Sequence, residues 1–143
     1  MPVSLKDYQK VNDFLEKNGV EIVLYGSLGV SVYLGNFKEF NDIDLVVNKE
    51  WLSDKWSELI GIMKQNGFEL VDQEKHEFIN NDGVGVSFLE NENYAGVKVD
   101  SGEIKVKTLS KEDFLEVYKR ESLKRNKESD RYIIRELEKR LQL

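Results

Sequence analysis

Hydrophobic and polar positions follow two periods along the chain, and each period predicts one type of element. Apolar residues recur at helical spacing from Leu5 to Leu15, directly after a capping-box pattern at Ser4 and Asp7. Residues 20–25 and 42–47 are rich in β-branched and aliphatic side chains, which favours strands. By the same criteria we expect a short helix over 28–34 ended by Gly35, a helix from Asn48 to Gly67, strands over 68–71, 77–79, 84–89, 94–99 and 104–107, a helix after Ser110, and a final helix over 124–141.

Turn signals divide the later part of the chain into hairpins. Asn80-Asn81-Asp82-Gly83 and Asp100-Ser101-Gly102 each lie between two expected strands. The element order places a β-rich stretch after the first strands and helices, and two helices at the end. This order predicts an α+β fold, with a mixed α/β sheet flanked by helices. No linker or repeat interrupts the chain, so residues 1–143 are expected to form a single domain.

The composition excludes several kinds of site and partner. The chain has no cysteine and a single histidine, which excludes disulfides and thiolate or multi-histidine zinc centres. It lacks a signal-peptide pattern and an apolar run long enough to span a bilayer, so we expect a cytoplasmic protein with no membrane partner. The net charge of −6 argues against strong nucleic-acid binding.

The charge is unevenly distributed along the chain. Residues 110–143 contain 10 Lys and Arg against 8 Asp and Glu, whereas the part before them is strongly acidic. A mildly basic C-terminal helix is consistent with contacts to phosphate. The simpler interpretation is a solvated helix face with i,i+4 ion pairs, such as Glu136 with Arg140.

A glycine and a serine follow the first expected strand directly. Gly26 allows a sharp turn and a close approach of a ligand to the backbone. Ser27 would begin the next helix, where free N–H groups and the helix dipole favour a phosphate group. Taken alone, the pattern is more often an ordinary structural turn.

Two aspartates alternate with an isoleucine at the start of the second expected strand. Asp42 and Asp44 would face the same side of that strand, with Ile43 pointing to the other. Neighbouring like charges repel, and a cation between them removes the repulsion. Mg²⁺ fits because it prefers oxygen ligands and keeps substrate phosphates in its shell. The alternative is an edge strand with two solvated aspartates.

Together the two patterns resemble the signature of the nucleotidyltransferase superfamily, and most closely that of the small lincosamide and aminoglycoside nucleotidyltransferases. The segment that carries the resemblance, residues 24–47, reads LYGSLGVSVYLGNFKEFNDIDLVV. Its matching features are Gly26-Ser27, the helix end Leu34-Gly35, the basic Lys38, and Asn41-Asp42-Ile43-Asp44. The likeness covers about 25 residues strongly and the remainder only in the order of elements.

The resemblance implies a Mg²⁺-dependent transferase. Gly26 and Ser27 would hold the phosphates of a nucleoside triphosphate such as ATP or GTP, with Lys38 either contacting phosphate or lying free in its loop. Asp42 and Asp44 would be the catalytic metal ligands for one or two Mg²⁺ ions. A nucleoside monophosphate would move to a hydroxyl acceptor, either a small molecule such as an antibiotic or a macromolecule, and pyrophosphate would leave. The small size further suggests a homodimer that completes the cleft.

One position departs from the family pattern. The family carries a third carboxylate on a later strand, and the matching position here is Ser87, which cannot act as a base. Glu90 and Glu77 are the possible substitutes. The alternative is therefore a catalytically degenerate relative that binds a nucleotide or a partner, as in a toxin–antitoxin system. A metal-binding α/β domain of unrelated ancestry is a further possibility.

Three other features have two interpretations each. His76 could contact a substrate, although a histidine in a polar run is more often an exposed residue at a strand start. Trp56 could stack on a base, but its helical spacing favours a place in the core. Lys127 and Asp130 fall where related transferases show a Lys-Asp run, and a surface i,i+3 pair explains them equally well.

Overall fold

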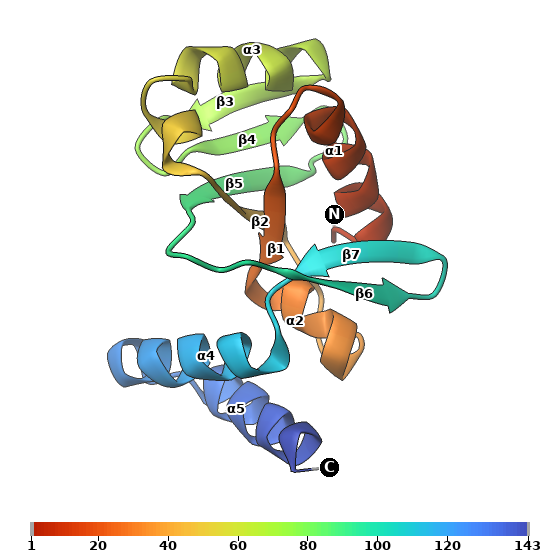
Figure 1. Cartoon of the computed structure of the whole chain (residues 1–143), viewed down its shortest axis with the longest axis vertical. Helices are drawn as coiled ribbons and strands as arrows, with labels where there is room; N and C mark the ends of the chain where they lie inside the picture. The colour runs from red at the N-terminus through yellow and green to blue at the C-terminus, as the bar shows by residue number, and fades with distance from the viewer. Residues whose placement is uncertain (1, 143) are drawn as a thin grey trace.

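A computed structural model describes residues 2–142, which form five α-helices around one seven-stranded mixed sheet (Figure 1). The strand order is β3-β4-β5-β2-β1-β7-β6. The strands are β1 (Ile22–Tyr25), β2 (Asp42–Val47), β3 (Phe68–Asp72), β4 (Glu77–Asn80), β5 (Gly85–Glu90), β6 (Val97–Ser101) and β7 (Ile104–Thr108). The helices are α1 (Leu5–Lys17), α2 (Gly26–Leu34), the 3-10 turn η1 (Lys49–Leu52), α3 (Trp56–Gln65), α4 (Lys111–Arg125) and α5 (Glu128–Leu141). The predicted α+β class with a mixed sheet is confirmed.

The sheet combines hairpins with two parallel pairings. The β3–β4, β4–β5, β1–β2 and β6–β7 pairs are antiparallel, whereas β2 pairs with β5, and β1 with β7, in parallel. The two predicted hairpins are those of β4–β5 and β6–β7. The parallel pairing of β2 with β5 brings a strand from the first third of the chain beside one from the middle of it.

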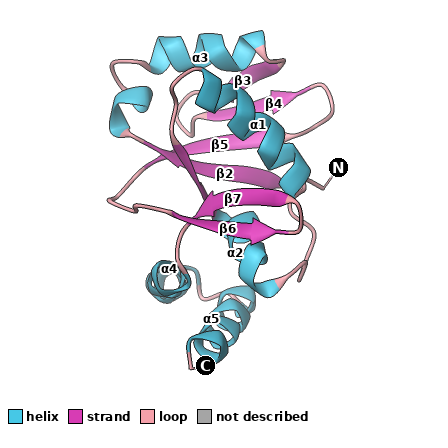
Figure 2. Cartoon of the chain, turned by 45° about the vertical axis from the view of Figure 1, so that its right-hand side comes forward, coloured by secondary structure: helices cyan, strands magenta, loops and turns pink. Residues whose placement is uncertain are grey.

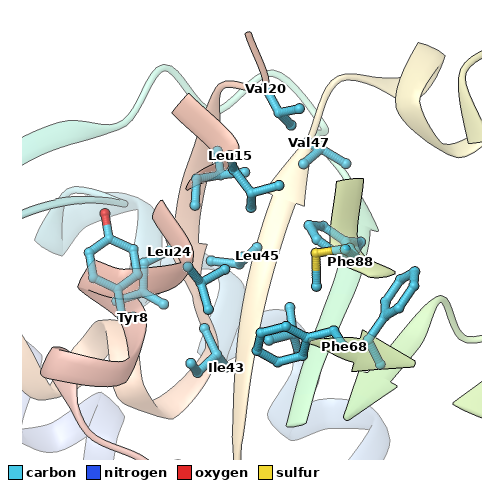
Figure 3. Packing of buried hydrophobic residues seen from close by; sticks show 14 of the residues in the cluster. Tyr8, Leu15, Val20, Leu24, Ile43, Leu45, Val47, Phe68 and Phe88 are labelled. Carbon is cyan, nitrogen blue, oxygen red and sulfur yellow. The ribbon is translucent and has the colours of Figure 1, made fainter. Parts of the chain in front are cut away.

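Strand alternation gives the sheet a separate core on each face. On one face, Leu24 and Leu45 belong to a cluster that packs against α1 and α3, and Figure 3 shows this packing. On the other face, Val23 and Val46 belong to a second cluster with α4 and α5. Figure 2 shows α1 lying across the strands and α4 and α5 together at the lower end of the sheet.

Two predicted helix starts are confirmed by their capping contacts. The backbone N–H of Ser4 donates to the Asp7 carboxylate at 2.9 Å, which closes the capping box of α1. The hydroxyl of Ser110 accepts from the backbone N–H of Asp113 at 3.1 Å and begins α4. Both contacts satisfy N–H groups that the helix itself leaves unpaired.

Three predicted helix boundaries are wrong. The short helix begins at Gly26 and not at residue 28, so the glycine belongs to the helix. The helix expected from Asn48 is divided into η1, whose Trp51 is buried in the core, and α3. The final helix expected over 124–141 is broken at Asn126, whose φ of 49° and ψ of 46° end α4. The break turns α5 back against α4.

No helix within residues 2–142 combines the length and the apolar character that a bilayer crossing requires.

Candidate functional site

The turn from β1 into α2 begins the candidate site. Gly26 has a φ of 66°, which a residue with a Cβ adopts only at a cost, so the predicted sharp turn is confirmed. Tyr25 is the N-cap of α2 and its side chain does not cap the helix. The first turn of α2 also contains no acidic residue. Its backbone N–H groups and the positive end of its dipole therefore remain available to an anion.

The two predicted aspartates lie on the face of β2 opposite to Ile43, which is fully buried. Their carboxylates rest against glycines of two different elements. A methyl group added at Gly26 would overlap the Asp44 carboxylate, and one added at Gly85 would overlap the Asp42 carboxylate. Each glycine therefore leaves space for one carboxylate, which would have to move if the glycine carried a Cβ.

Asp44 occupies an unfavourable environment for a negative charge. Its pKa is raised from 3.8 to about 6, chiefly by burial and also by the negative charges of Asp42 and Glu77, while the charge of Lys38 acts in the opposite direction. A buried carboxylate beside an exposed one, with one nearby lysine, is short of positive charge. Two hard oxygen donors in this state fit a divalent cation such as Mg²⁺, which proteins hold through one or two carboxylates together with substrate phosphates.

Asp44 forms part of the wall of two cavities. The first, which we call the α2–α5 cavity, has a volume of about 370 Å³. It is lined by Tyr25, Gly26, Ser27, Lys38, Asp44, Leu89, Phe114, Val117, Tyr118, Glu121, Arg125, Lys127, Ser129, Asp130 and Ile133. Three cations and the first turn of α2 therefore surround one hollow.

The second cavity, which we call the β4–β5 cavity, has a volume of about 620 Å³. It is lined by Tyr25, Asp44, Lys49, Leu52, Ser53, Glu74, Lys75, His76, Glu77, Ser87, Phe88, Leu89 and Glu90. The two cavities share Tyr25, Asp44 and Leu89. Burial raises the pKa of Tyr25 to about 12, so its hydroxyl stays protonated at neutral pH and can donate a hydrogen bond from this shared wall.

The structure brings together four of the five predicted site residues. Gly26, Ser27, Lys38 and Asp44 all line the α2–α5 cavity. Asp42 is exposed beside Gly85 and acts on Asp44 through its charge, but it does not line either cavity. Within residues 2–142 no group of three or more Asp, Glu or His side chains is arranged to hold an ion together.

Comparison with known proteins shows which family the chain belongs to. No protein-family model matches the sequence. The uncharacterized protein YnaI of Bacillus subtilis (strain 168) is 34% identical to it over 109 residues, which cover 71% of this chain and 70% of YnaI. The chain belongs to the YnaI family.

Solved structures identify the fold of this YnaI relative. The lincomycin-bound lincosamide antibiotic adenylyltransferase LnuA has a TM-score of 0.74 and 19% identity, covering 96% of this chain and 98% of LnuA. The antibiotic-resistance factor ANT(2″)-Ia has a TM-score of 0.68 and 15% identity, covering 94% and 82%. An antigenic nucleotidyltransferase-like protein from Paracoccidioides brasiliensis has a TM-score of 0.63 and 17% identity, covering 96% and 78%. The chain has the nucleotidyltransferase fold, and at these identities the likeness establishes the fold alone.

The sequence-based interpretation of Lys127 and Asp130 as a surface pair is wrong. Asp130 is 3% exposed and accepts two hydrogen bonds from the guanidinium of Arg125, at 2.8 and 3.0 Å. This fork holds Arg125 at the wall of the α2–α5 cavity. Sequence reasoning missed Arg125 because it expected one helix through residue 126. Asn126, six residues before the next apolar position at Tyr132, was the only local signal of the break.

The expectation that His76 is an exposed residue is also wrong. His76 is half-buried, with its ring 4.9 Å from that of Trp56 in an edge-to-face arrangement, and its φ is 54°. Trp56 packs against the first core cluster, as predicted, and also contacts Phe78. The histidine therefore forms part of the floor of the β4–β5 cavity. The predicted Glu136–Arg140 pair is confirmed at 3.2 Å.

An Asp130→Asn substitution is expected to lower the free energy of unfolding by about 2 kcal/mol. It removes the buried negative charge that pairs with the guanidinium of Arg125. The loss is smaller than for a fully buried pair, since the Arg125 side chain is 42% exposed. Urea unfolding followed by circular dichroism measures it.

Glu138→Gln provides the matched control for that measurement. Glu138 pairs with Lys119 at 3.7 Å and also links α5 to α4, but both side chains are about half exposed. We expect this change to cost less than about 0.5 kcal/mol. Equal losses in the two variants would contradict the structural role of the Arg125–Asp130 pair.

Proposed function

We propose that this chain is a divalent-metal-dependent nucleotidyltransferase that moves a nucleoside monophosphate from a nucleoside triphosphate to a hydroxyl acceptor. The observation that carries the proposal is the position of Asp44, which forms part of the wall of two cavities of different character. The α2–α5 cavity has the cations that a triphosphate requires, and the β4–β5 cavity has room for an acceptor. The reacting phosphorus would lie beside the carboxylate that the two cavities share.

Each residue of the α2–α5 cavity has a role in this proposal. The N–H groups at Gly26 and the hydroxyl of Ser27 would bind phosphate oxygens at the start of α2. Lys38 and Lys127 would balance the phosphate charge, and Arg125, held in place by Asp130, would bind phosphate with its planar fork. These contacts fix the nucleotide so that its α-phosphorus faces the β4–β5 cavity.

Asp42 and Asp44 would hold the metal ion, here assigned as Mg²⁺. When bound, the ion neutralises phosphate charge and favours the departure of pyrophosphate. The proposed site depends on Asp44 reaching its charged form, which its raised pKa opposes below about pH 6. A bound cation stabilises that charged form.

The acceptor is proposed to be a small hydroxyl-bearing molecule. LnuA is described as a lincosamide adenylyltransferase with lincomycin bound, and ANT(2″)-Ia has been solved with adenylyl-2″-tobramycin. The β4–β5 cavity, at about 620 Å³, suits a molecule of drug size. Action in the cytoplasm, where ATP and GTP are available, and a homodimer that extends the cleft are part of the proposal.

Calorimetric titration tests the nucleotide site. We expect wild-type protein to bind ATP or GTP in the presence of Mg²⁺, and the Asp42→Asn and Asp44→Asn variants to bind at least about tenfold more weakly, because each variant removes one carboxylate from the metal site. Asp100→Asn, an identical change at an exposed position in β6, is the control and should bind as the wild type does. Unchanged affinity in both site variants would refute the assignment of the metal site.

A second candidate function is favoured by Ser87. This serine pairs directly with Asp44 across β2 and β5, at the position where the fold family has a third carboxylate. A chain without a base would bind Mg²⁺ and a nucleotide and act as a regulatory or partner-binding module. Transfer of label from [α-³²P]ATP or GTP to lincomycin, tobramycin or simple polyols would exclude this second candidate.

A further inference from the structure

Transfer to a hydroxyl requires a group that accepts the hydroxyl proton, and general bases of this kind contribute roughly 10²–10⁴-fold in rate. Asp42 and Asp44 are assigned to the metal in the proposed function, and Ser87 has no basic group at neutral pH. The β4–β5 cavity contains three other carboxylates, those of Glu74, Glu77 and Glu90. The register of the sheet distinguishes among them.

Glu77 lies in one cross-strand row with Asp44. Asp44 on β2 pairs with Ser87 on β5, and Ser87 pairs with Glu77 on β4. Residues in such a row share a face of the sheet, and two strand spacings place the outer Cα atoms about 10 Å apart. The residue between them in this row is a serine, whose side chain is short. The charge of Glu77 contributes to the raised pKa of Asp44, as expected for two groups that line one cavity.

Glu74 and Glu90 do not share a cross-strand row with Asp44. Glu90 pairs with Val47, a core residue three positions along β2 from Asp44, and it lies exposed at the end of β5. Glu74 belongs to the exposed turn between β3 and β4 and has no strand partner. Glu77 is half-buried and fixed by the β4–β5 ladder.

We propose that Glu77 is the general base of the transfer, supplied from β4 in place of a carboxylate on β5. Its carboxylate accepts the proton of the acceptor hydroxyl. The acceptor oxygen forms a bond to the α-phosphorus, and the bond from that phosphorus to the bridging oxygen breaks. Pyrophosphate leaves with the electron pair, and Glu77 later releases its proton to water. This assignment rests on the proposed function and adds the residue that performs the proton transfer.

The test compares Glu77→Gln with Glu69→Gln, an identical change at an exposed position of β3 that lines neither cavity. Turnover is followed by transfer of label from [α-³²P]ATP or GTP to the best acceptor of the panel, and nucleotide binding by calorimetry with Mg²⁺. We expect Glu77→Gln to lower kcat about 10²–10⁴-fold, with affinity for the Mg²⁺-nucleotide within about twofold of the wild type. Glu69→Gln should retain turnover within about threefold.

A rescue variant separates proton transfer from a structural role of Glu77. The double variant Glu77→Gln with Ser87→Asp places a carboxylate next to Asp44 in the same row. If the loss in Glu77→Gln is the loss of a base, the double variant should recover at least about tenfold in kcat, whereas a folding defect would persist. A circular dichroism melt of each variant confirms that the fold is intact.

The possible failures are distinguishable from one another. A Glu77→Gln variant that keeps kcat within about threefold of the wild type overturns the role of Glu77 and leaves the proposed function standing. Wild-type protein that binds the Mg²⁺-nucleotide but labels no acceptor overturns the role of Glu77 in favour of the binding module. Wild-type protein that fails to bind the nucleotide overturns the proposed function, and the role of Glu77 with it.

Discussion

Asp44→Asn is expected to make the protein more stable at pH 7.5 while removing its proposed activity. Burial and like charges raise the pKa of Asp44 from 3.8 to about 6, so the folded protein carries an unfavourable charge at neutral pH. Each pKa unit corresponds to about 1.4 kcal/mol, which makes the gain on removing the charge up to about 3 kcal/mol. A functional site that requires a buried charge lowers the folding stability of the protein in this way.

The sign of the pH dependence follows from the direction of the shift. An acid with a raised pKa destabilises the folded state only where it is charged, so the penalty is absent below the unfolded value of 3.8 and complete above about 6. The advantage of Asp44→Asn over the wild type should therefore grow between about pH 4 and pH 7 and disappear below pH 4.

Thermal and urea unfolding across this pH range measure the effect. Asp100→Asn, at an exposed strand position, should show no such gain. Mg²⁺ should stabilise the wild type above pH 6 and leave Asp44→Asn unchanged, because the variant lacks one of the two proposed ligands. If Asp44→Asn were less stable than the wild type at pH 7.5, the negative charge of Asp44 would not destabilise the folded protein, and the prediction would be wrong.

Gly26→Ala is expected to be the most damaging single-methyl change in the site. Gly26 has a φ of 66°, and an added methyl group would overlap the Asp44 carboxylate and lie 3.2 Å from its Cβ and Cγ. Backbone strain accounts for roughly 1 kcal/mol of the loss, and overpacking against Asp44 for roughly 2 kcal/mol more. The displaced carboxylate should also lower Mg²⁺-nucleotide affinity by at least about tenfold.

Gly35→Ala separates the two causes. Gly35 ends the same helix with a φ of 79°, but a methyl group there would meet nothing within 4 Å. This variant should lose only a strain part, about 1–3 kcal/mol because the ψ of Gly35 is −172°, and bind nucleotide as the wild type does. Urea unfolding and calorimetry on both variants make the comparison. If the two glycine variants behaved alike, the close contact between α2 and Asp44 would have no energetic consequence.

The elements nearest the site were predictable because their signals are local. The strand over 42–47 is observed with its predicted bounds, since alternation of Asp42, Ile43 and Asp44 with a following aliphatic run is a property of adjacent residues. The turn at Gly26 was predictable for the same reason, as a glycine directly after a buried strand. The family resemblance rests on these two segments.

The second half of the site depends on contacts between distant residues. Arg125 reaches the α2–α5 cavity because Asn126 adopts a left-handed conformation and Asp130 then holds the guanidinium. Asparagine permits that conformation without requiring it, and packing of α5 against α4 makes the choice. The local pattern therefore began the final helix at residue 124, whereas α4 continues to Arg125 and α5 begins at Glu128.

The sequence by itself determined the strand–glycine–helix turn, the facing aspartates and the absence of a carboxylate at Ser87, since these depend on residue identity and local spacing. Only the tertiary structure decided that Asp44 forms part of the wall of two cavities and that Glu77 lies in its row across Ser87. Sheet register brings Asp44 and Glu77 into one row although they are 33 positions apart in the sequence, and this register follows from the burial of both sheet faces as a whole.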